Sequence, residues 1–456
     1  MSLVNKRYSR REALSTGVKV AVGVAGAAIV GGAAYVMLGL PAATPQKVKL
    51  DFTVWNYSVE TIRDNIQKFM QQYPNIEVTL YDFNWPDYPS TMVQRFTTKT
   101  STDVCYNGED WLAQWAEAGW VVPLEDYWDK YTTKKKFSEY VRDMVPFAKE
   151  SMTYKGKIYG LPYYSDMFTF MYNEKILRDN GIEVPNSWED VLDASLKLKE
   201  KGIRYPYILQ YQATNPFDFY AVFSGAMGRG ARLFDENLNP IFASEDHPFY
   251  EHLQWIVDGI HKYKIVNPDY LATHETDAAK KMGAGEGAFT VLAKYMLAAM
   301  NAPGSSPNAG NFRLALMPGK THEAYGFAKM YNMTRMCVDR GDAAIQAAIT
   351  FIEYFGANDS PVLKRWAVEK GLGFGFLSPY DDPDIAKSLI DYYGSGADKS
   401  IKEQASIAKT IPHPVWFGQW VDYSIKEAIA KAFANEITVK EAVDRMARRA
   451  KELKGG

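Results

Sequence analysis

The stretch Val48–Leu80, VKLDFTVWNYSVETIRDNIQKFMQQYPNIEVTL, decides the fold class. Val48, Leu50, Phe52 and Val54 alternate with polar residues, which predicts a strand. After Ser58, a reasonable N-cap, apolar residues recur on one helical face as far as Met70, and the alternation of a strand resumes over 76–80. A strand, a helix and a second strand in this order predict a parallel sheet with right-handed crossovers. The first domain is therefore expected to be α/β.

Polar and aromatic residues follow the predicted strands. The sequence WNYS begins at Trp55, and NGEDW follows a further predicted strand over 102–105. In open α/β sheets, ligands collect where the carboxyl ends of the strands meet helix N-termini and loops. Both segments are candidate ligand contacts.

The segment Gly156–Gly202 carries a second pattern. Two β-prone runs, Tyr159–Pro162 and Met167–Tyr172, flank a predicted aromatic bend, YYSD. The SWED sequence beginning at Ser187 is an S-x-x-D capping box and predicts the start of a helix. The bend places rings and a carboxylate where the chain changes direction, as in a ligand wall.

Length and composition limit the function classes. A chain of 456 residues is expected to form two domains. A net charge of -2 gives no general attraction to phosphate backbones, so nucleic acid is not an expected partner. With 6 His and 2 Cys and no CxxC or HExxH spacing, the sequence predicts no metal site and no cofactor.

The first 46 residues differ from the rest. Basic residues from Lys6 to Lys19 precede an uncharged, largely apolar run over 20–46, which predicts an export segment. Arg10 and Arg11 resemble a twin-arginine signal. Cleavage and retention as a membrane anchor both stay open, and the basic flank predicts that the remaining chain lies outside the cell.

Cys105 and Cys337 allow a disulfide outside the cell. Two separate buried thiols are the favoured interpretation.

Several short motifs, in order, resemble the extracellular solute-binding proteins of carbohydrate ABC transporters, the maltose-binding-protein-like family. These are the GK-hydrophobic-GLP strand at Gly156–Pro162, the YN strand at Tyr172, PNSWED from Pro185, GEGAF from Gly285, LALMPG from Leu314 and IPHPVWF from Ile411. The resemblance covers about 48–453. It implies a type II periplasmic-binding-protein-like fold, with two α/β lobes joined by crossing hinge strands.

The resemblance also sets the expected lobe boundaries. Residues 1–46 are the export segment, lobe 1 is 47–163 plus 319–357, and lobe 2 is 164–318 plus 358–456. The first crossing is expected near Pro162–Phe168 and the second near Leu314–Gly319.

The implied function is capture of a sugar or oligosaccharide between the lobes and its delivery to an ABC permease, by a chain expected to be monomeric. Sugar binding needs rings for stacking and planar polar groups for hydroxyls. Trp416 or Phe417 matches the family's stacking ring, and Asp166 its polar residue at the first crossing. The candidate ligand-binding residues are Trp55, Asn56, Tyr57, Asn107, Glu109, Asp110, Trp111, Tyr164, Asp166, Phe217, Asp218, Tyr295, Tyr331, Trp416 and Phe417.

Other interpretations stay open. Any one of the rings can be core packing, and Glu109 and Asp110 can be acids placed for a helix dipole. The same scaffold also suits a glycerol phosphate, a peptide or a polyamine. A polysaccharide-degrading enzyme is disfavoured, because the adjacent carboxylates at 109–110 and 381–382 rarely face one site together and no nucleophile elbow or P-loop occurs.

Overall fold

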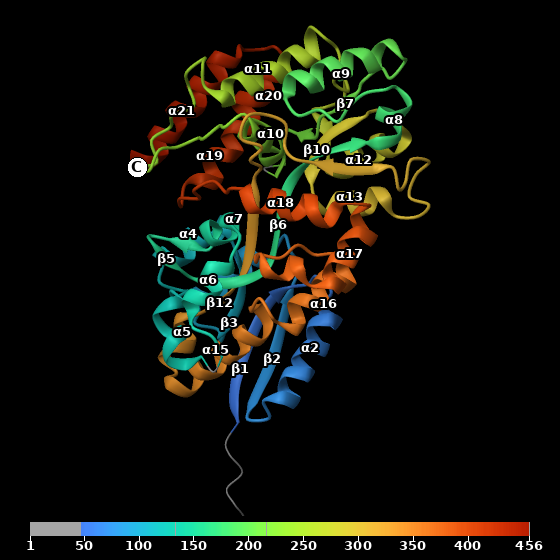
Figure 1. Cartoon of the computed structure of the whole chain (residues 1–456). Helices are drawn as coiled ribbons and strands as arrows, with labels where there is room; N and C mark the ends of the chain where they lie inside the picture. The colour runs from blue at the N-terminus through green and yellow to red at the C-terminus, as the bar shows by residue number, and fades with distance from the viewer. Residues whose placement is uncertain (1–46, 133, 216, 456) are drawn as a thin grey trace, which may run out of the picture. The chain divides into compact units, whose positions relative to one another are not determined.

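The computed structural model describes residues 47–132, 134–215 and 217–455. The expected export segment, the twin-arginine motif and the anchor lie outside these residues. Residues from Lys47 onward form one compact unit (Figure 1). Among the described helices, none is both long and apolar enough to span a bilayer.

The strands are β1 (Val48–Trp55), β2 (Ile76–Phe83), β3 (Val104–Gly108), β4 (Thr153–Tyr154), β5 (Lys157–Ile158), β6 (Gly160–Asn173), β7 (Tyr207–Ile208), β8 (Tyr211–Gln212), β9 (Ala272–Thr273), β10 (Phe289–Ala293), β11 (Phe312–Ala315) and β12 (Gly326–Met333).

The helices up to β12 are α2 (Val59–Gln72), α3 (Tyr88–Thr97), α4 (Glu109–Glu117), α5 (Glu125–Tyr131), α6 (Phe137–Asp143), α7 (Pro146–Ser151), α8 (Glu174–Asp179), α9 (Trp188–Glu200), α10 (Phe217–Gly228), α11 (Pro248–His261), α12 (Glu275–Ala284) and α13 (Tyr295–Asn301). After β12 follow α14 (Arg335–Asp339), α15 (Asp342–Gly356), α16 (Pro361–Lys370), the short 3-10 helix η1 (Ser378–Asp381), α17 (Pro383–Tyr393), α18 (Ala397–Ile407), α19 (Phe417–Tyr423), the π-helical turn η2 (Ser424–Ile429), α20 (Ala430–Phe433) and α21 (Val439–Gly455).

The main sheet has the strand order β2-β1-β3-β12-β6-β10-β7, and β11 also pairs with β6. β1 pairs in parallel with both β2 and β3, as the opening strand–helix–strand pattern predicts. β6 and β12 run antiparallel to each other between the β1–β3 group and the β10–β7 group (Figure 1). They are the two strands that join the halves of the sheet.

Two hydrophobic cores lie on either side of this join. Phe52, Tyr106 and Phe351 belong to the first core, and Trp188, Phe249 and Trp420 belong to the second. Two cores joined by crossing strands confirm the predicted two-lobed α/β class. Helices α16 to α18 pack on the first core through residues such as Trp366 and Leu389. The residue boundaries of the lobes stay a prediction.

The first crossing differs from the predicted strand–bend–strand. β6 is one continuous strand from Gly160 to Asn173. Its pairing with β12 shifts register between Lys329 and Met330, where Tyr164 and Pro162 are the partners, so Tyr163 is the extra residue of a bulge. The sequence predicts a bend at this point, but the strand bends only locally, at the bulge. The residues on both sides of Tyr163 stay paired with β12, so the chain remains extended.

The predicted second crossing at Leu314–Gly319 is wrong. That segment begins in β11, which pairs only with the far half of β6 at Phe170–Asn173. The crossing strand is β12, which pairs with β3 on one edge and β6 on the other. The helix predicted from Ser187 is confirmed: α9 begins at Trp188, and the Asp190 amide donates to Ser187 Oγ at 3.1 Å.

The two cysteines are free and buried. Cys105 lies in β3. Cys337 lies in α14, whose N-cap Thr334 accepts a hydrogen bond from the Cys337 amide at 3.2 Å. The favoured interpretation of two separate thiols agrees with this arrangement.

Candidate functional site

A charged cluster forms where the two cores approach each other. Glu109 and Asp110 open α4 directly after β3, and Lys329 lies opposite Gly108 on β12. Lys329 Nζ donates to Glu109 Oε1 at 2.9 Å and to Asp110 Oδ2 at 3.4 Å. The side chains of Glu109 and Lys329 are 4% and 10% exposed, whereas that of Asp110 is 37% exposed. Asp110 is therefore the carboxylate that solvent can reach.

Asp110 also contacts the second core. Tyr220 of α10 donates its hydroxyl hydrogen to Asp110 Oδ1 at 3.0 Å, and His413 Nε2 lies 3.8 Å from the same oxygen. Tyr220 packs in the second core, whereas Leu112 of α4 packs in the first. We call Glu109, Asp110, Tyr220, Lys329 and His413 the central polar cluster. Its hydrogen bonds join the two lobes.

The two carboxylates and the lysine of this cluster have shifted pKa values, and the two carboxylates shift in opposite directions. Burial raises the pKa of Glu109 to about 7, although Lys329 opposes the shift. Burial also acts to raise the pKa of Asp110, but Lys329, His413 and the Tyr220 hydrogen bond outweigh it and lower this pKa. Burial acts to lower the pKa of Lys329, and the two carboxylates reverse this and raise it. One cation thus holds one carboxylate ionised, while the other titrates near neutrality.

Aromatic rings border the cluster. The centroid of the Trp85 ring lies 5.0 Å from that of Trp55 and 5.3 Å from that of Trp111. Lys329 Nζ lies within 6 Å of the centroids of Trp85, Trp111 and Phe327. Phe217 packs beside Phe327 with a centroid distance of 5.9 Å. Flat rings next to paired carboxylates are the groups that a polar ligand with apolar faces requires.

A second buried ion pair joins Asp166 of the crossing strand β6 to Lys294, which follows β10. Asp166 Oδ1 is 3.6 Å from Lys294 Nζ, and both side chains are almost fully buried. Tyr164 donates its hydroxyl hydrogen to Asp166 Oδ2 at 2.8 Å, and Lys294 donates to the Tyr393 hydroxyl at 2.8 Å. Tyr295 follows Lys294 and donates to Glu275 at 2.6 Å. We call Asp166 and Lys294 the hinge ion pair.

The remaining predicted residues are distributed between surface and interior. Asn56 and Tyr57 are exposed after β1, and Asn56 Nδ2 donates to Asn84 Oδ1 at 2.7 Å. Trp416 is partly buried against Phe234, with a centroid distance of 5.6 Å. Four of these predicted residues are fully enclosed: Asn107, Asp218, Tyr331 and Phe417. Asn107 donates to Asn332 at 2.6 Å, and Asp218 accepts from the Gln212 amide at 2.5 Å. Tyr331 packs on Tyr106, and Phe417 packs on Trp420.

The sequence does not single out several members of the site. Trp85 follows the carboxyl end of β2, and the reasoning that selects WNYS and NGEDW also applies to it. Lys329 is the one charged residue in the buried strand GFAKMYNM, a pattern that indicates a paired partner. Tyr220 is one of many rings in the sequence and no motif singles out His413, so only the fold shows that both lie beside Asp110.

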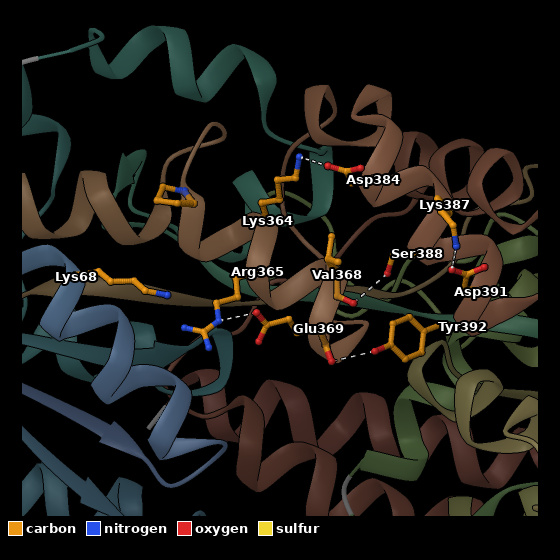
Figure 2. A pocket seen from close by; sticks show the side chains of 11 residues that line it. Lys68, Lys364, Arg365, Val368, Glu369, Asp384, Lys387, Ser388, Asp391 and Tyr392 are labelled. Atoms are coloured by element: carbon orange, nitrogen blue, oxygen red, sulfur yellow. Dashed lines mark hydrogen bonds and ion pairs between the residues drawn. The ribbon is translucent and has the colours of Figure 1, made fainter.

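A pocket of about 690 Å³ lies elsewhere, between α2, α16 and α17 (Figure 2). Arg365 pairs with Glu369 at 2.8 Å, Lys364 pairs with Asp384 at 2.7 Å, and Lys387 pairs with Asp391. None of the predicted site residues lines this pocket. Its cations are already neutralised by adjacent carboxylates.

The fold has two cores joined by crossing strands, and a charged cluster lies where the cores meet. A profile of the bacterial extracellular solute-binding protein family matches residues 55–442. The chain belongs to this family, and the predicted resemblance is confirmed.

Individual relatives are distant. The chain is 22% identical over 337 residues to the maltotriose-binding protein of Pyrococcus abyssi, a match that covers 72% of this chain and 66% of that protein. It is 24% identical over 159 residues to the mannitol-binding protein of Pseudomonas aeruginosa, covering 33% of this chain and 34% of that protein. The matches therefore span less than two thirds of these relatives' lengths.

The fold is shared more widely than the sequence. The sugar-binding protein MalE of Xanthomonas citri superposes with a TM-score of 0.75 at 17% identity, covering 90% of this chain and 98% of that one. The cyclic alpha-maltosyl-1,6-maltose binding protein of Arthrobacter globiformis gives a TM-score of 0.74 at 16% identity, covering 90% of this chain and all of the other. These similarities confirm the fold class.

Proposed function

We propose that this protein captures a sugar or oligosaccharide between its lobes and delivers it to an ABC permease. The observation that carries the proposal is the central polar cluster, in which Asp110 of one lobe meets Tyr220 of the other beside exposed and half-buried rings. Several relatives bear the names of proteins that bind maltotriose, mannitol or diacetylchitobiose. Their ligands are polyhydroxyl compounds, which suits a site of this composition.

Binding alone is the proposed mechanism, and no catalytic step is assigned. A ligand that contacts both lobes only in the closed state shifts the hinge equilibrium by its differential affinity. In this scheme Asp110 accepts from a ligand hydroxyl, Trp111 and Phe217 border the sugar faces, and Lys329 keeps Asp110 ionised. The lobe division and the ligand-binding roles of the predicted residues that are not fully enclosed belong to the same proposal.

The rival solutes are less well supported. A phosphate ligand requires convergent cations, but Arg229 pairs with Glu189 at 2.8 Å and Arg232 with Glu323 at 2.7 Å. The third candidate cation, Arg335, begins α14 beside the start of β3, at the opposite end of that strand from Glu109. A polyamine requires surplus carboxylates, and Lys329 already neutralises one of the two in the cluster. A neutral ligand with many hydroxyls needs neither convergent cations nor surplus carboxylates.

Export and partners complete the proposal. We infer that the protein is a monomer that acts outside the cell after export through the twin-arginine-like segment. Residues 1–46 are then either cleaved, which releases the protein, or retained as a membrane anchor. Members of this family are extracellular solute-binding proteins, which supports the external location.

Calorimetric titration with a sugar panel tests the function. Asp110→Asn and Trp111→Ala should each weaken the wild-type affinity at least tenfold, while thermal unfolding stays cooperative. Trp416→Ala tests the family-based stacking role in the same assay. Gln114→Ala, on the same helix α4, is the matched control. Absence of any sugar binding by the wild-type protein refutes the proposal, and unchanged affinity in the Asp110 and Trp111 variants refutes the site.

A further inference from the structure

The carboxyl ends of three parallel strands set out a row of candidate contacts. β2, β1 and β3 are neighbours in this order, and β12 follows. Asn84 and Trp85 follow β2, Asn56 and Tyr57 follow β1, and the carboxylates of the central polar cluster follow β3. Neighbouring strands lie about 4.8 Å apart, so the row from β2 to β12 extends over about 14 Å. That distance is longer than a single sugar ring.

A separate pocket of about 510 Å³ occupies the β2 end of this row. Its lining includes Asn56, Asn84, Asp87, Ser90 and Thr91, all of them amide, hydroxyl or carboxylate side chains. Asn56 donates to Asn84 at 2.7 Å, which fixes the two amides relative to each other. Within 47–132, no described hydrogen bond uses the Asn84 side-chain nitrogen or the Asp87 carboxylate. The pocket therefore presents both a donor and an acceptor to a solute.

Trp85 lies between this pocket and the central polar cluster. Trp85 follows the pocket residue Asn84 in sequence. Its ring packs against Trp55 and Trp111, and Lys329 Nζ lies 5.8 Å from its centroid. Although supported by these rings, Trp85 remains 45% exposed. Tryptophan is on average highly buried, so an exposed ring held by its neighbours is a preformed stacking surface.

We propose that the solute extends from the central polar cluster across Trp85 into the pocket of Asn56, Asn84 and Asp87, and that the ligand class is an oligosaccharide. This inference rests on the proposed sugar-binding function and specifies its ligand. The ring of Trp85 stacks on a sugar unit beyond the central one. The amides and the Asp87 carboxylate bind the hydroxyls of the terminal unit.

The test compares ligand lengths. Wild-type protein is titrated calorimetrically with three series of increasing length: glucose to maltotetraose, galactose through melibiose to raffinose, and N-acetylglucosamine to triacetylchitotriose. In the series that binds, affinity should rise at least tenfold from the single sugar to the trisaccharide. In Trp85→Ala that gain should disappear while affinity for the shortest ligand that binds stays within about twofold.

Two further variants separate stacking from misfolding. Trp85→Phe keeps a ring and should recover most of the gain with length. Asp87→Ala should lose part of it without disturbing α3, because the Asp87 side chain makes no capping hydrogen bond. Tyr81→Ala, which removes an exposed ring from β2 outside the pocket, is the control.

The outcomes distinguish the two proposals. A wild-type protein that binds a single sugar as tightly as the longer chains overturns the oligosaccharide inference and leaves the sugar-binding function in place. A gain with length that persists in Trp85→Ala overturns the assignment to Trp85 and its pocket. Binding of none of the sugars overturns both proposals.

Discussion

The substitution Glu109→Gln tests the electrostatics of the central polar cluster most directly. The Glu109 carboxyl is nearly fully buried, and burial raises its pKa from an ordinary value of 4.5 to about 7. The folded state therefore holds a proton on this group that the unfolded state releases between these two pH values. Stability from the protonated form is fully present below about pH 4.5 and is lost as the pH rises to about 7.

The magnitude follows from the pKa rise. A rise from 4.5 to about 7 corresponds to about 3 kcal/mol between the two protonation states. The free energy of unfolding of the wild-type protein should thus fall by about 3 kcal/mol more, between pH 4 and pH 8, than that of Glu109→Gln. Glutamine keeps the shape and an acceptor for Lys329 Nζ but does not titrate. Titrating groups remote from Glu109 contribute equally to both proteins and cancel in the difference, whereas Asp110 and Lys329 respond to the substitution and are part of the measured effect.

Urea unfolding at several pH values measures this difference, with tryptophan fluorescence and far-ultraviolet circular dichroism as independent probes of a single transition. Glu60→Gln removes an exposed carboxyl from α2 and serves as the control. Parallel pH profiles for the wild-type protein and Glu109→Gln refute the reasoning, because they mean that Glu109 titrates alike in the folded and unfolded chains.

Three further predictions concern the residues around the cluster and the crossing strands. Burial lowers the pKa of His413 to about 4, so the stability that its neutral form contributes is present above about pH 6.5 and is lost as the pH falls toward 4. His413→Gln should therefore make the free energy of unfolding less dependent on pH on the acid side. An unchanged pH dependence below about pH 6.5 contradicts this prediction. Lys294→Met should reduce the free energy of unfolding by about 3–5 kcal/mol, because it leaves Asp166 buried without its cation. The exposed control Lys280→Met should change the free energy of unfolding by less than about 0.5 kcal/mol. Equal urea midpoints for the two variants disprove the pairing. Gly373→Ala should lower the free energy of unfolding by about 1–3 kcal/mol, because the added Cβ would lie 2.0 Å from the Ser165 carbonyl oxygen of β6. In the control Gly418→Ala in α19, the added Cβ meets nothing within 4 Å, so this variant should be neutral or stabilising. A Gly373→Ala melting temperature equal to that of the wild type shows that the loop moves aside freely.

Local patterns predict an α/β first domain, whereas the two-lobed arrangement is implied by the family resemblance. The alternation over Val48–Val54 and the helical face ending at Met70 give the β1–α2–β2 unit, and the capping box at Ser187 gives the start of α9. Each of these signals depends on neighbours within a few residues. Pairings between distant strands leave no such signal, which is why β12 at Gly326–Met333 was not predicted as the second crossing and why the bulge at Tyr163 was expected to be a bend.

The same limit applies to the site. Glu109 and Asp110 were selected because they follow a strand, and they do lie at the start of α4. Lys329 is 220 residues from Glu109 in sequence, so their pairing becomes visible only when β12 aligns with β3. Tyr331 and Asn107 have the chemistry of ligand contacts, but both side chains are buried, because β12 and β3 are covered on both faces of the sheet.

The contact between Asp110 and Tyr220 also explains why a neutral polyhydroxyl ligand fits the proposed mechanism better than an ion. This contact joins the lobes through a carboxylate that accepts and a phenol that donates. A ligand that enters between them must offer a donor to Asp110 and an acceptor to Tyr220 at adjacent positions, and a sugar hydroxyl offers both. An added cation would meet the charge of Lys329 beside the same carboxylate, and an added anion would meet the charge of Asp110 itself. In the proposed mechanism, the hydrogen bond between Asp110 and Tyr220 therefore favours uncharged ligands with adjacent hydroxyls, because these can replace it without leaving a charge unpaired.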